Sequence, residues 1–287
     1  MGFSIKELIF KNRYLLFLTE QELAGPWFSF KLYGDDVGMI PVILKNIEPT
    51  PIYKLVNSRK GTIIDRITLD FDIKEYLKKL IREEKIDAIN FSREDMYIRL
   101  YIDVFNKPKV PFINTFFTFK NISDYDLLDF NIYFVFDFDI NGLEGFDNDL
   151  AGYDEKNDII YQYDSSSLYG GFSPISKSTN FQSCLTKDFH INQENLNLSN
   201  KLPQQPGEIL SALQIEFKTL HPEQTFQTAL TISGGLNQQE LINNIVDGKS
   251  NAITFLTQVN RNIKSTQRNL QEEAFVKLNL QEARDCE

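Results

Sequence analysis

Apolar and polar residues alternate through much of the chain before residue 238, and this pattern predicts β-strands. In residues 96–105, MYIRLYIDVF, the apolar residues Ile98, Leu100 and Ile102 alternate with a polar or aromatic set. Successive side chains of a strand point to opposite faces. We therefore predict a half-buried antiparallel strand with one apolar face.

Residues 127–140, LLDFNIYFVFDFDI, form the longest strand-like run of the chain. One face carries Phe130, Ile132 and Phe134, and the other carries Tyr133. Because both faces are largely apolar near the middle, we predict that this strand lies between two layers of structure.

Other strand-like segments follow one another with few helices between them. They occupy residues 13–20, 26–33, 39–46, 62–71, 110–121, 181–191, 209–220 and 224–235. This order predicts a mainly β protein: a large two-sheet antiparallel β-sandwich, or supersandwich, with a short inserted helix and a C-terminal helical tail.

Two segments change to a helical period. Apolar residues three and four apart predict an inserted amphipathic helix over about 73–85, with Asp72 as its N-cap. From residue 238 the pattern is helical again, and a first helix is predicted to end at Gly248. We divide the chain into a sandwich domain, residues 1–237, and a helical segment, residues 238–287. We expect this segment to pack on the sandwich, because a polar helix alone is marginally stable.

The charge and composition exclude several classes of function. The chain has 287 residues, a net charge of −10 and 42% hydrophobic residues, and it shows no stripe of Lys and Arg. Nucleic acids and anionic membranes are bound mainly through cationic side chains, so we expect neither partner. The two cysteines, Cys184 and Cys286, predict free thiols and a cytoplasmic location. We expect no cofactor.

An acidic loop follows the longest strand. It carries Asp137, Asp139, Asp147, Asp149, Asp154 and Asp158. The sequence Asp137 to Gly142 matches the start of a calcium loop, with oxygen ligands at positions 1, 3 and 5 and then glycine. Position 12 is Asn148 where an EF-hand needs glutamate, so only another kind of calcium site stays open.

Two further interpretations of the acidic loop remain. A pair of its carboxylates could act as general acid and base on a sugar, with His190 as a further candidate. Alternatively, Asp and Asn side chains shape turns through local hydrogen bonds, which is the interpretation we favour. No nucleophile motif or phosphate-binding loop is present in the sequence.

Tyrosines gather around the acidic loop, and aromatic rings beside acids and amides suit the stacking and hydrogen bonding of sugars. The alternative, which we favour, is that these rings are ordinary packing residues. We name no catalytic residue and no metal ligand. The predicted binding residues are Asp137, Asp139, Asp147, Asp149, Tyr153, Asp154, Tyr161 and Tyr163.

Residues 95–247 resemble the N-terminal β-supersandwich domain of bacterial and archaeal glucoamylase-type hydrolases (glycoside hydrolase family 15). The resemblance rests on an aromatic strand that leads into the pattern D-x-A-x-Y-D, here residues 149–154. A strand with a glycine and a helix with a polar start follow later, here residues 234–241. The resemblance implies a galactose mutarotase-like fold.

In that family the domain normally precedes an α-helical barrel that carries the catalytic glutamates. This sequence has no such barrel after residue 237, so no family active-site residue carries over. We expect a non-catalytic accessory or binding module for a carbohydrate or a partner protein. The alternative is a small carbohydrate-active enzyme of the mutarotase or epimerase type that uses the acidic-loop carboxylates.

Overall fold

The structure, a computed structural model, describes residues 7–17, 25–34, 38–44, 53–61, 64–83, 96–105, 109–142, 145 and 147–258. The chain divides into two compact units, Met1–Lys249 and Ser250–Glu287. Residues 250–258 of the second unit are helical. Within the described ranges, no helix is both long and apolar enough to cross a membrane.

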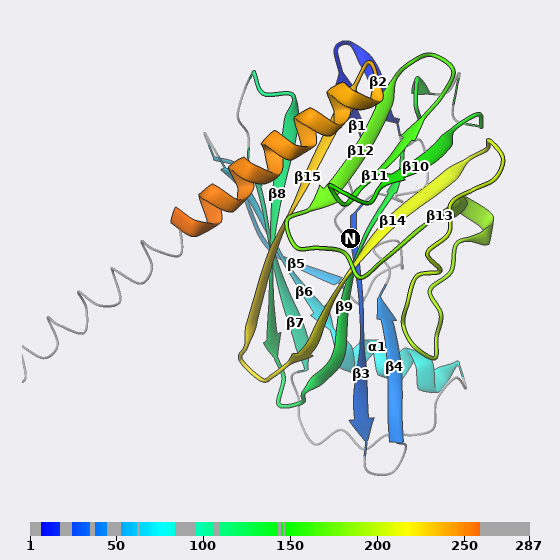
Figure 1. The fold of residues 1–287 in the computed structure, drawn as a ribbon. Helices are drawn as coiled ribbons and strands as arrows, with labels where there is room; N and C mark the ends of the chain where they lie inside the picture. The colour runs from blue at the N-terminus through cyan, green and yellow to red at the C-terminus, as the bar shows by residue number, and fades with distance from the viewer. Residues whose placement is uncertain are drawn as a thin grey trace, which may run out of the picture. The chain divides into compact units, whose positions relative to one another are not determined.

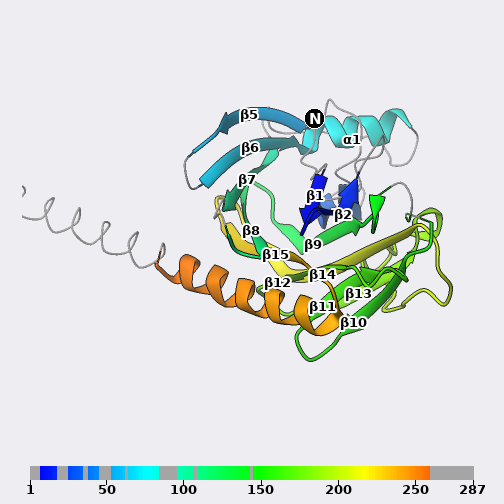
Figure 2. The same ribbon diagram turned by 90° about the horizontal axis from the view of Figure 1, so that it is seen from above.

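The larger sheet of the first unit has eight antiparallel strands among the described residues. Its order is β10-β11-β12-β15-β8-β7-β6-β5, and the sheet curves from β5 round to β10 (Figure 2). These strands are β5 (Tyr53–Arg59), β6 (Ile64–Asp72), β7 (Tyr97–Phe105), β8 (Phe112–Ile122), β10 (Leu150–Asp154), β11 (Ile159–Tyr163), β12 (Tyr169–Pro174) and β15 (Thr225–Gly235).

The second sheet has five antiparallel strands in the described part, in the order β13-β14-β9-β3-β4. They are β3 (Gly25–Gly34), β4 (Gly38–Leu44), β9 (Leu127–Asp137), β13 (Asn180–Leu185) and β14 (Ile209–Leu220). A separate hairpin pairs β1 (Glu7–Phe10) with β2 (Arg13–Phe17). The predicted two-sheet antiparallel sandwich is confirmed, although the sequence pattern did not predict β1, β5, β10, β11 or β12 as strands.

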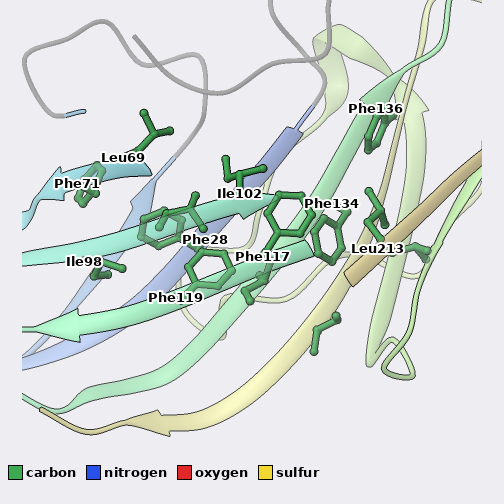
Figure 3. Close-up of a cluster of buried hydrophobic side chains, with 14 of the residues drawn as sticks. Phe28, Leu69, Phe71, Ile98, Ile102, Phe117, Phe119, Phe134, Phe136 and Leu213 are labelled. Carbon is green, nitrogen blue, oxygen red and sulfur yellow. The ribbon is translucent and has the colours of Figure 1, made fainter. Parts of the chain in front are cut away.

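β9 lies between β14 and β3 in the five-stranded sheet and is buried on both faces, as predicted. On its inner face Phe134 packs against Phe117 of β8, with ring centroids 5.2 Å apart. Phe130 packs likewise against Phe119 at 5.6 Å. All four rings belong to the core between the sheets. Figure 3 shows Phe117, Phe119 and Phe134 in this core. Each fully buried Phe contributes roughly 1.5–3 kcal/mol relative to an exposed one.

The outer face of β9 is covered by the Asn- and Gln-rich segment that connects β13 to β14. Tyr133 of β9 clusters there with Trp27 and Leu198. The buried amide of Gln214 accepts a hydrogen bond from the backbone N–H of Leu198 (2.9 Å) and donates one to the Asn131 side chain (2.8 Å). These amide bonds hold the segment on the sheet and satisfy polar groups that would otherwise be buried without partners.

Two short connections join the sheets at one end of the sandwich. Residues 123–126 lead from β8 to β9, and residues 221–224 lead from β14 to β15. The two connections are linked through Asn121: its carbonyl accepts from the Glu223 N–H (2.9 Å), and its N–H donates to the carbonyl of Gln224 (3.1 Å). The two layers are therefore tied together at this end.

The inserted helix is α1 (Ile73–Arg82), and its predicted N-cap is confirmed. The Asp72 carboxylate accepts a hydrogen bond of 2.9 Å from the N–H of Glu75, one of the helix's orphan donors. One face of the helix buries Ile73 and Leu77 in the sandwich core.

Residues 238–249 form a helix on the outer face of the eight-stranded sheet (Figure 1). Its Leu241 and Ile245 pack against Ile159 and Tyr161 of β11. The Asn237 side chain caps the helix by accepting the N–H of Glu240 at 2.9 Å. The packing of Leu241 and Ile245 covers apolar side chains of β11 that would otherwise face solvent.

The prediction that this helix ends at Gly248 is wrong. Gly248 is helical, and its carbonyl accepts a hydrogen bond of 3.0 Å from the Asn114 side chain of β8. A Cβ at Gly248 would lie 2.3 Å from Cγ2 of Thr231. The glycine therefore permits close approach of the helix to the sheet, and it does not serve as a left-handed cap.

Candidate functional site

Two of the predicted site carboxyls lie in the interior of the sandwich. Asp137 ends β9 and is 4% exposed, and Asp149 is 0% exposed. Burial raises the pKa of Asp149 to about 9; the N–H of Ile140, 3.3 Å from its Oδ2, opposes the shift, and the charge of Asp164 adds to it. Burial also raises the pKa of Asp137, and the charge of Asp139 adds to this shift. Asp149 is therefore a neutral acid at pH 7.

The next two acidic residues do not join this pair in an ion site. Asp139 is half-buried, and Asp147 is exposed and accepts a hydrogen bond of 2.9 Å from the side chain of Asn148. Within the described residues, no three His, Cys, Asp or Glu side chains gather as a metal ion would require.

Asp154 shapes the tight turn between β10 and β11, as the turn interpretation of the loop expects. Its Oδ1 accepts the N–H of Lys156 at 3.0 Å, and its Oδ2 accepts the side-chain amide of Asn157 at 2.8 Å. Tyr153 donates a hydrogen bond of 2.8 Å from its hydroxyl to Asp158. The Asp154 contacts are local to the turn, whereas the ring of Tyr153 packs against the sandwich core and stacks on Phe181 of β13, with ring centroids 4.2 Å apart.

Tyr161 and Tyr163 lie on the opposite face of β11 from the sandwich core. The hydroxyl of Tyr161 accepts a hydrogen bond of 2.7 Å from Gln238 at the start of the helix. Tyr163 stacks on Tyr169 with ring centroids 5.1 Å apart. The eight predicted residues are thus not gathered in one place. Asp137, Asp149 and Tyr153 face the interior, Asp154 bonds its own turn, Tyr161 and Tyr163 lie on the outer face, and Asp139 and Asp147 stay in the acidic loop. Alternation along β10 and β11 separates them, because neighbouring residues of a strand face opposite sides.

The structure brings a different polar set together at the end of the sandwich where β9 ends. A hollow of about 430 Å³ lies between the β1–β2 hairpin, the acidic loop and the β11–β12 connection. Ligand sites commonly enclose ~300–1,000 Å³. The lining residues are Asn12, Arg13, Tyr14, Asn141, Gly145, Asp164 and Ser166.

A hydrogen-bond network fixes the polar wall of this hollow, which we call the Arg13–Asp164 hollow. Arg13 donates from Nε to Oδ1 of Asn141 (3.1 Å) and from Nη1 to the carbonyl of Ser166 (3.2 Å). Asn141 donates in turn to Oδ2 of Asp164 (2.6 Å). The Ser166 N–H donates to Oδ1 of the same carboxylate (2.9 Å). Side chains held in this way are preorganised for a ligand.

Backbone turns position these groups. Asn12 has a φ of 63°, so the hairpin reverses tightly just before Arg13. Asn141 has a φ of 68°, a left-handed conformation that asparagine tolerates better than most residues. The N–H of Asn141 donates to the carbonyl of Tyr14 at 3.0 Å and so joins the acidic loop to the hairpin. Tyr14 is 38% exposed at the hollow.

Sequence reasoning missed this hollow, although it examined two of its segments. Asn141 falls within the calcium-loop match, and the sequence pattern gives no site role to Arg13, Asp164 or Ser166. Arg13 is 128 residues from Asn141 and 153 from Ser166. No short motif can show contacts over such separations, so no sequence signal could have found the hollow.

Comparisons with known proteins identify no family for the chain. No protein-family model matches it, and no curated protein sequence matches it. Among solved structures, a bacterial glucoamylase complexed with acarbose aligns with a TM-score of 0.49 and 12% identity, over 80% of this chain and 29% of that chain.

Two other solved structures also align with the chain. A polysaccharide lyase aligns with a TM-score of 0.43 and 11% identity, over 83% of this chain and 31% of the lyase. The galactose 1-epimerase of Lactobacillus acidophilus NCFM aligns with a TM-score of 0.38 and 9% identity, over 82% of this chain and 89% of the epimerase. The chain therefore spans less than a third of the glucoamylase and lyase structures. The narrower resemblance to the glucoamylase N-terminal domain stays a prediction.

Proposed function

We propose that the chain is a non-catalytic binding module that holds a neutral saccharide in the Arg13–Asp164 hollow. The observation that carries the proposal is a fixed hydrogen-bond donor and a fixed carboxylate on one polar wall, with the exposed ring of Tyr14 beside them. A sugar presents hydroxyls at its edge and apolar C–H groups on its faces. The hollow offers a partner to each of these parts.

The charges of the hollow favour a neutral ligand. Arg13 and Asp164 carry opposite formal charges on the same wall. An anionic ligand would meet the carboxylate of Asp164, and a cationic ligand would meet the guanidinium of Arg13. A hydroxyl both donates and accepts hydrogen bonds, so it fits a wall that holds both kinds of group.

The hydrogen-bond donors and acceptors that the network leaves unused also favour a neutral ligand with hydroxyl groups. Among the described residues, Asn141 uses both side-chain N–H donors, one on Asp164 and one on Ser166. Arg13 keeps one N–H of Nη1, because Nε, the other N–H of Nη1 and both of Nη2 are used. The carboxylate of Asp164 keeps acceptor capacity beyond its three bonds. One donor and one acceptor thus remain for a ligand hydroxyl.

Catalysis by the acidic loop is supported less well. An acid and a base must both reach a substrate in one cleft. The carboxyls with raised pKa values, Asp137 and Asp149, are buried in the sandwich. Proton NMR of anomer exchange in α-glucose and α-galactose tests this alternative, and exchange faster than the buffer control would support it.

A glycan array followed by calorimetric titration tests the binding proposal. We expect a neutral glycan to bind, and Tyr14→Ala and Asp164→Asn to weaken its binding at least tenfold, about 1.4 kcal/mol. Tyr163→Ala is the matched control, because it removes a tyrosine from the surface that the sequence had suggested. Binding that Tyr163→Ala abolishes and Tyr14→Ala leaves intact would contradict the proposal, as would an array without any bound neutral glycan. Thermal melting of each variant checks that it is folded.

A further inference from the structure

A second recess lies on the other side of the β1–β2 hairpin. It has a volume of about 360 Å³ and lies between β1, the segment of residues 109–113 that enters β8, and the end of β15. Four consecutive residues, 8–11, line it from the hairpin side. Alternate residues of a strand point to opposite faces, so a consecutive run shows that the backbone edge of β1 borders the recess.

The edge of β1 that faces away from β2 has no hydrogen-bonded strand neighbour among the described residues. In the part of the chain that the structure describes, β1 pairs with β2 and with no other strand. An unpaired strand edge is a template for an added strand. The outer edge of β2 differs, since the carbonyl of Tyr14 accepts the N–H of Asn141 there.

The walls beside this edge are apolar. Leu8, Phe10, Val110, Pro111 and Phe112 line the recess. Ile9 lines it too and is 51% exposed. Apolar surface gathered in one concave place marks a binding surface, whereas scattered exposed apolar residues do not.

The charge at the rim differs in sign from that of the whole chain, whose net charge is −10. The described lining includes two lysines, Lys11 and Lys109, and no acidic residue. Nζ of Lys11 pairs with Glu240 at 2.6 Å. Lys109 is exposed and forms no ion pair with any described residue. A carboxylate of a ligand could therefore form an ion pair with Lys109.

We infer that this recess binds an extended peptide segment of a partner protein, which adds a strand to the free edge of β1. Alternate apolar side chains of the segment fill the recess, and an Asp or Glu of the segment meets Lys109. In this mode the backbone bonds supply affinity and the side-chain pockets supply specificity. The inference does not depend on saccharide binding, because its residues do not line the Arg13–Asp164 hollow.

Selection from a displayed library of random heptapeptides tests the inference. We expect the full chain to enrich peptides with alternate apolar residues and at least one Asp or Glu. Synthetic copies should bind at least tenfold more weakly to Lys109→Glu and to Ile9→Asp, and unchanged to Lys177→Glu, an exposed lysine elsewhere. N-methylation of alternate peptide nitrogens should also abolish binding, because it removes the strand hydrogen bonds.

Several results would overturn it. One is a library that enriches the same peptides on Lys109→Glu as on the unaltered chain; another is a library that enriches none. Binding that survives backbone methylation would exclude strand addition. Sedimentation that shows a dimer dissociated by Lys109→Glu would assign the recess to a second copy of this chain instead. Melting curves of the variants separate lost binding from lost folding.

Discussion

The side-chain amide of Gln162 on β11 donates a hydrogen bond of 2.8 Å to the hydroxyl of Ser211 on β14, inside the core between the two sheets. The same amide donates to the carbonyl of Ile209 (2.8 Å) and accepts the N–H of Phe138 (3.0 Å). One buried side chain therefore satisfies backbone groups at the edge of the acidic loop and links both layers.

Replacing this amide should destabilise the fold markedly. Gln162→Leu leaves the N–H of Phe138 and the carbonyl of Ile209 buried without this partner, and we expect a loss of about 3 kcal/mol in the free energy of unfolding. Urea denaturation measures it. Gln227→Leu, at an exposed position, is the control and should change stability by less than about 0.5 kcal/mol. Equal effects of the two substitutions would show that the link between the sheets is unimportant.

The raised pKa of Asp149 gives a pH dependence of known sign. In the unfolded chain the carboxyl ionises near its ordinary pKa of 3.8, while in the folded chain it stays protonated up to about 9. Between these values the unfolded state loses a proton that the folded state keeps, so stability falls as pH rises, by up to about 1.4 kcal/mol per pH unit.

Asp149→Asn should remove this dependence. The amide keeps an acceptor for the N–H of Ile140 and cannot ionise. We expect equal melting temperatures of variant and parent near pH 4, and a variant that becomes progressively more stable toward pH 9. Calorimetric melts at pH 4, 6, 8 and 9 measure the difference. A variant less stable than the parent at pH 8 would show that the carboxylate is ionised and bound to a partner.

Gly234 of β15 sets the position of the β1–β2 hairpin. A Cβ at this position would lie 2.6 Å from Cγ of Phe10 and 2.8 Å from Cδ1 of Leu15. Gly234→Ala should therefore displace the hairpin and lower stability by about 1–3 kcal/mol. Hydrogen exchange of the hairpin amides should rise in this variant. Gly207→Ala, whose Cβ would meet only side-chain carbons of Leu185, is the control and should leave hairpin exchange unchanged.

The N-cap of α1 offers a smaller and well-defined effect. Asp72→Ala removes the acceptor of the Glu75 N–H and should lower stability by about 1 kcal/mol. Asp72→Ser should restore most of this loss, because serine also caps helices. Chemical denaturation resolves the difference; similar stabilities of the Ala and Ser variants would mean that the cap bond is not formed in solution.

Local patterns predicted the elements whose cause is local. The aromatic alternation of β9 predicted its burial on both faces, and the change of period at Asp72 predicted α1 with its cap. β10 was not predicted, because its sequence, LAGYD, has little apolar alternation. Gly152 there makes room for the ring of Tyr161, which would lie 2.4 Å from a Cβ. Such a contact is a property of the folded pair and not of either segment.

The candidate site could not be predicted for the same reason. The sequence directed attention to the density of aspartates, but density does not determine where each carboxyl points. Asp149 turned inward and Asp154 bonded its own turn, while Asp164 joined Arg13 through Asn141. Hydrogen bonds between distant segments decide which acids remain available to a ligand.

The connections at residues 123–126 and 221–224 join the two sheets at one end of the sandwich. The Arg13–Asp164 hollow lies at the other end of β9, beside the acidic loop and the β1–β2 hairpin. At this end the layers are linked through the side chain of Gln162, which bonds Phe138, Ile209 and Ser211. A ligand that binds only the folded chain and sits in the hollow stabilises this end of the sandwich, so saccharide binding should slow hydrogen exchange at the start of β14 more than at its end.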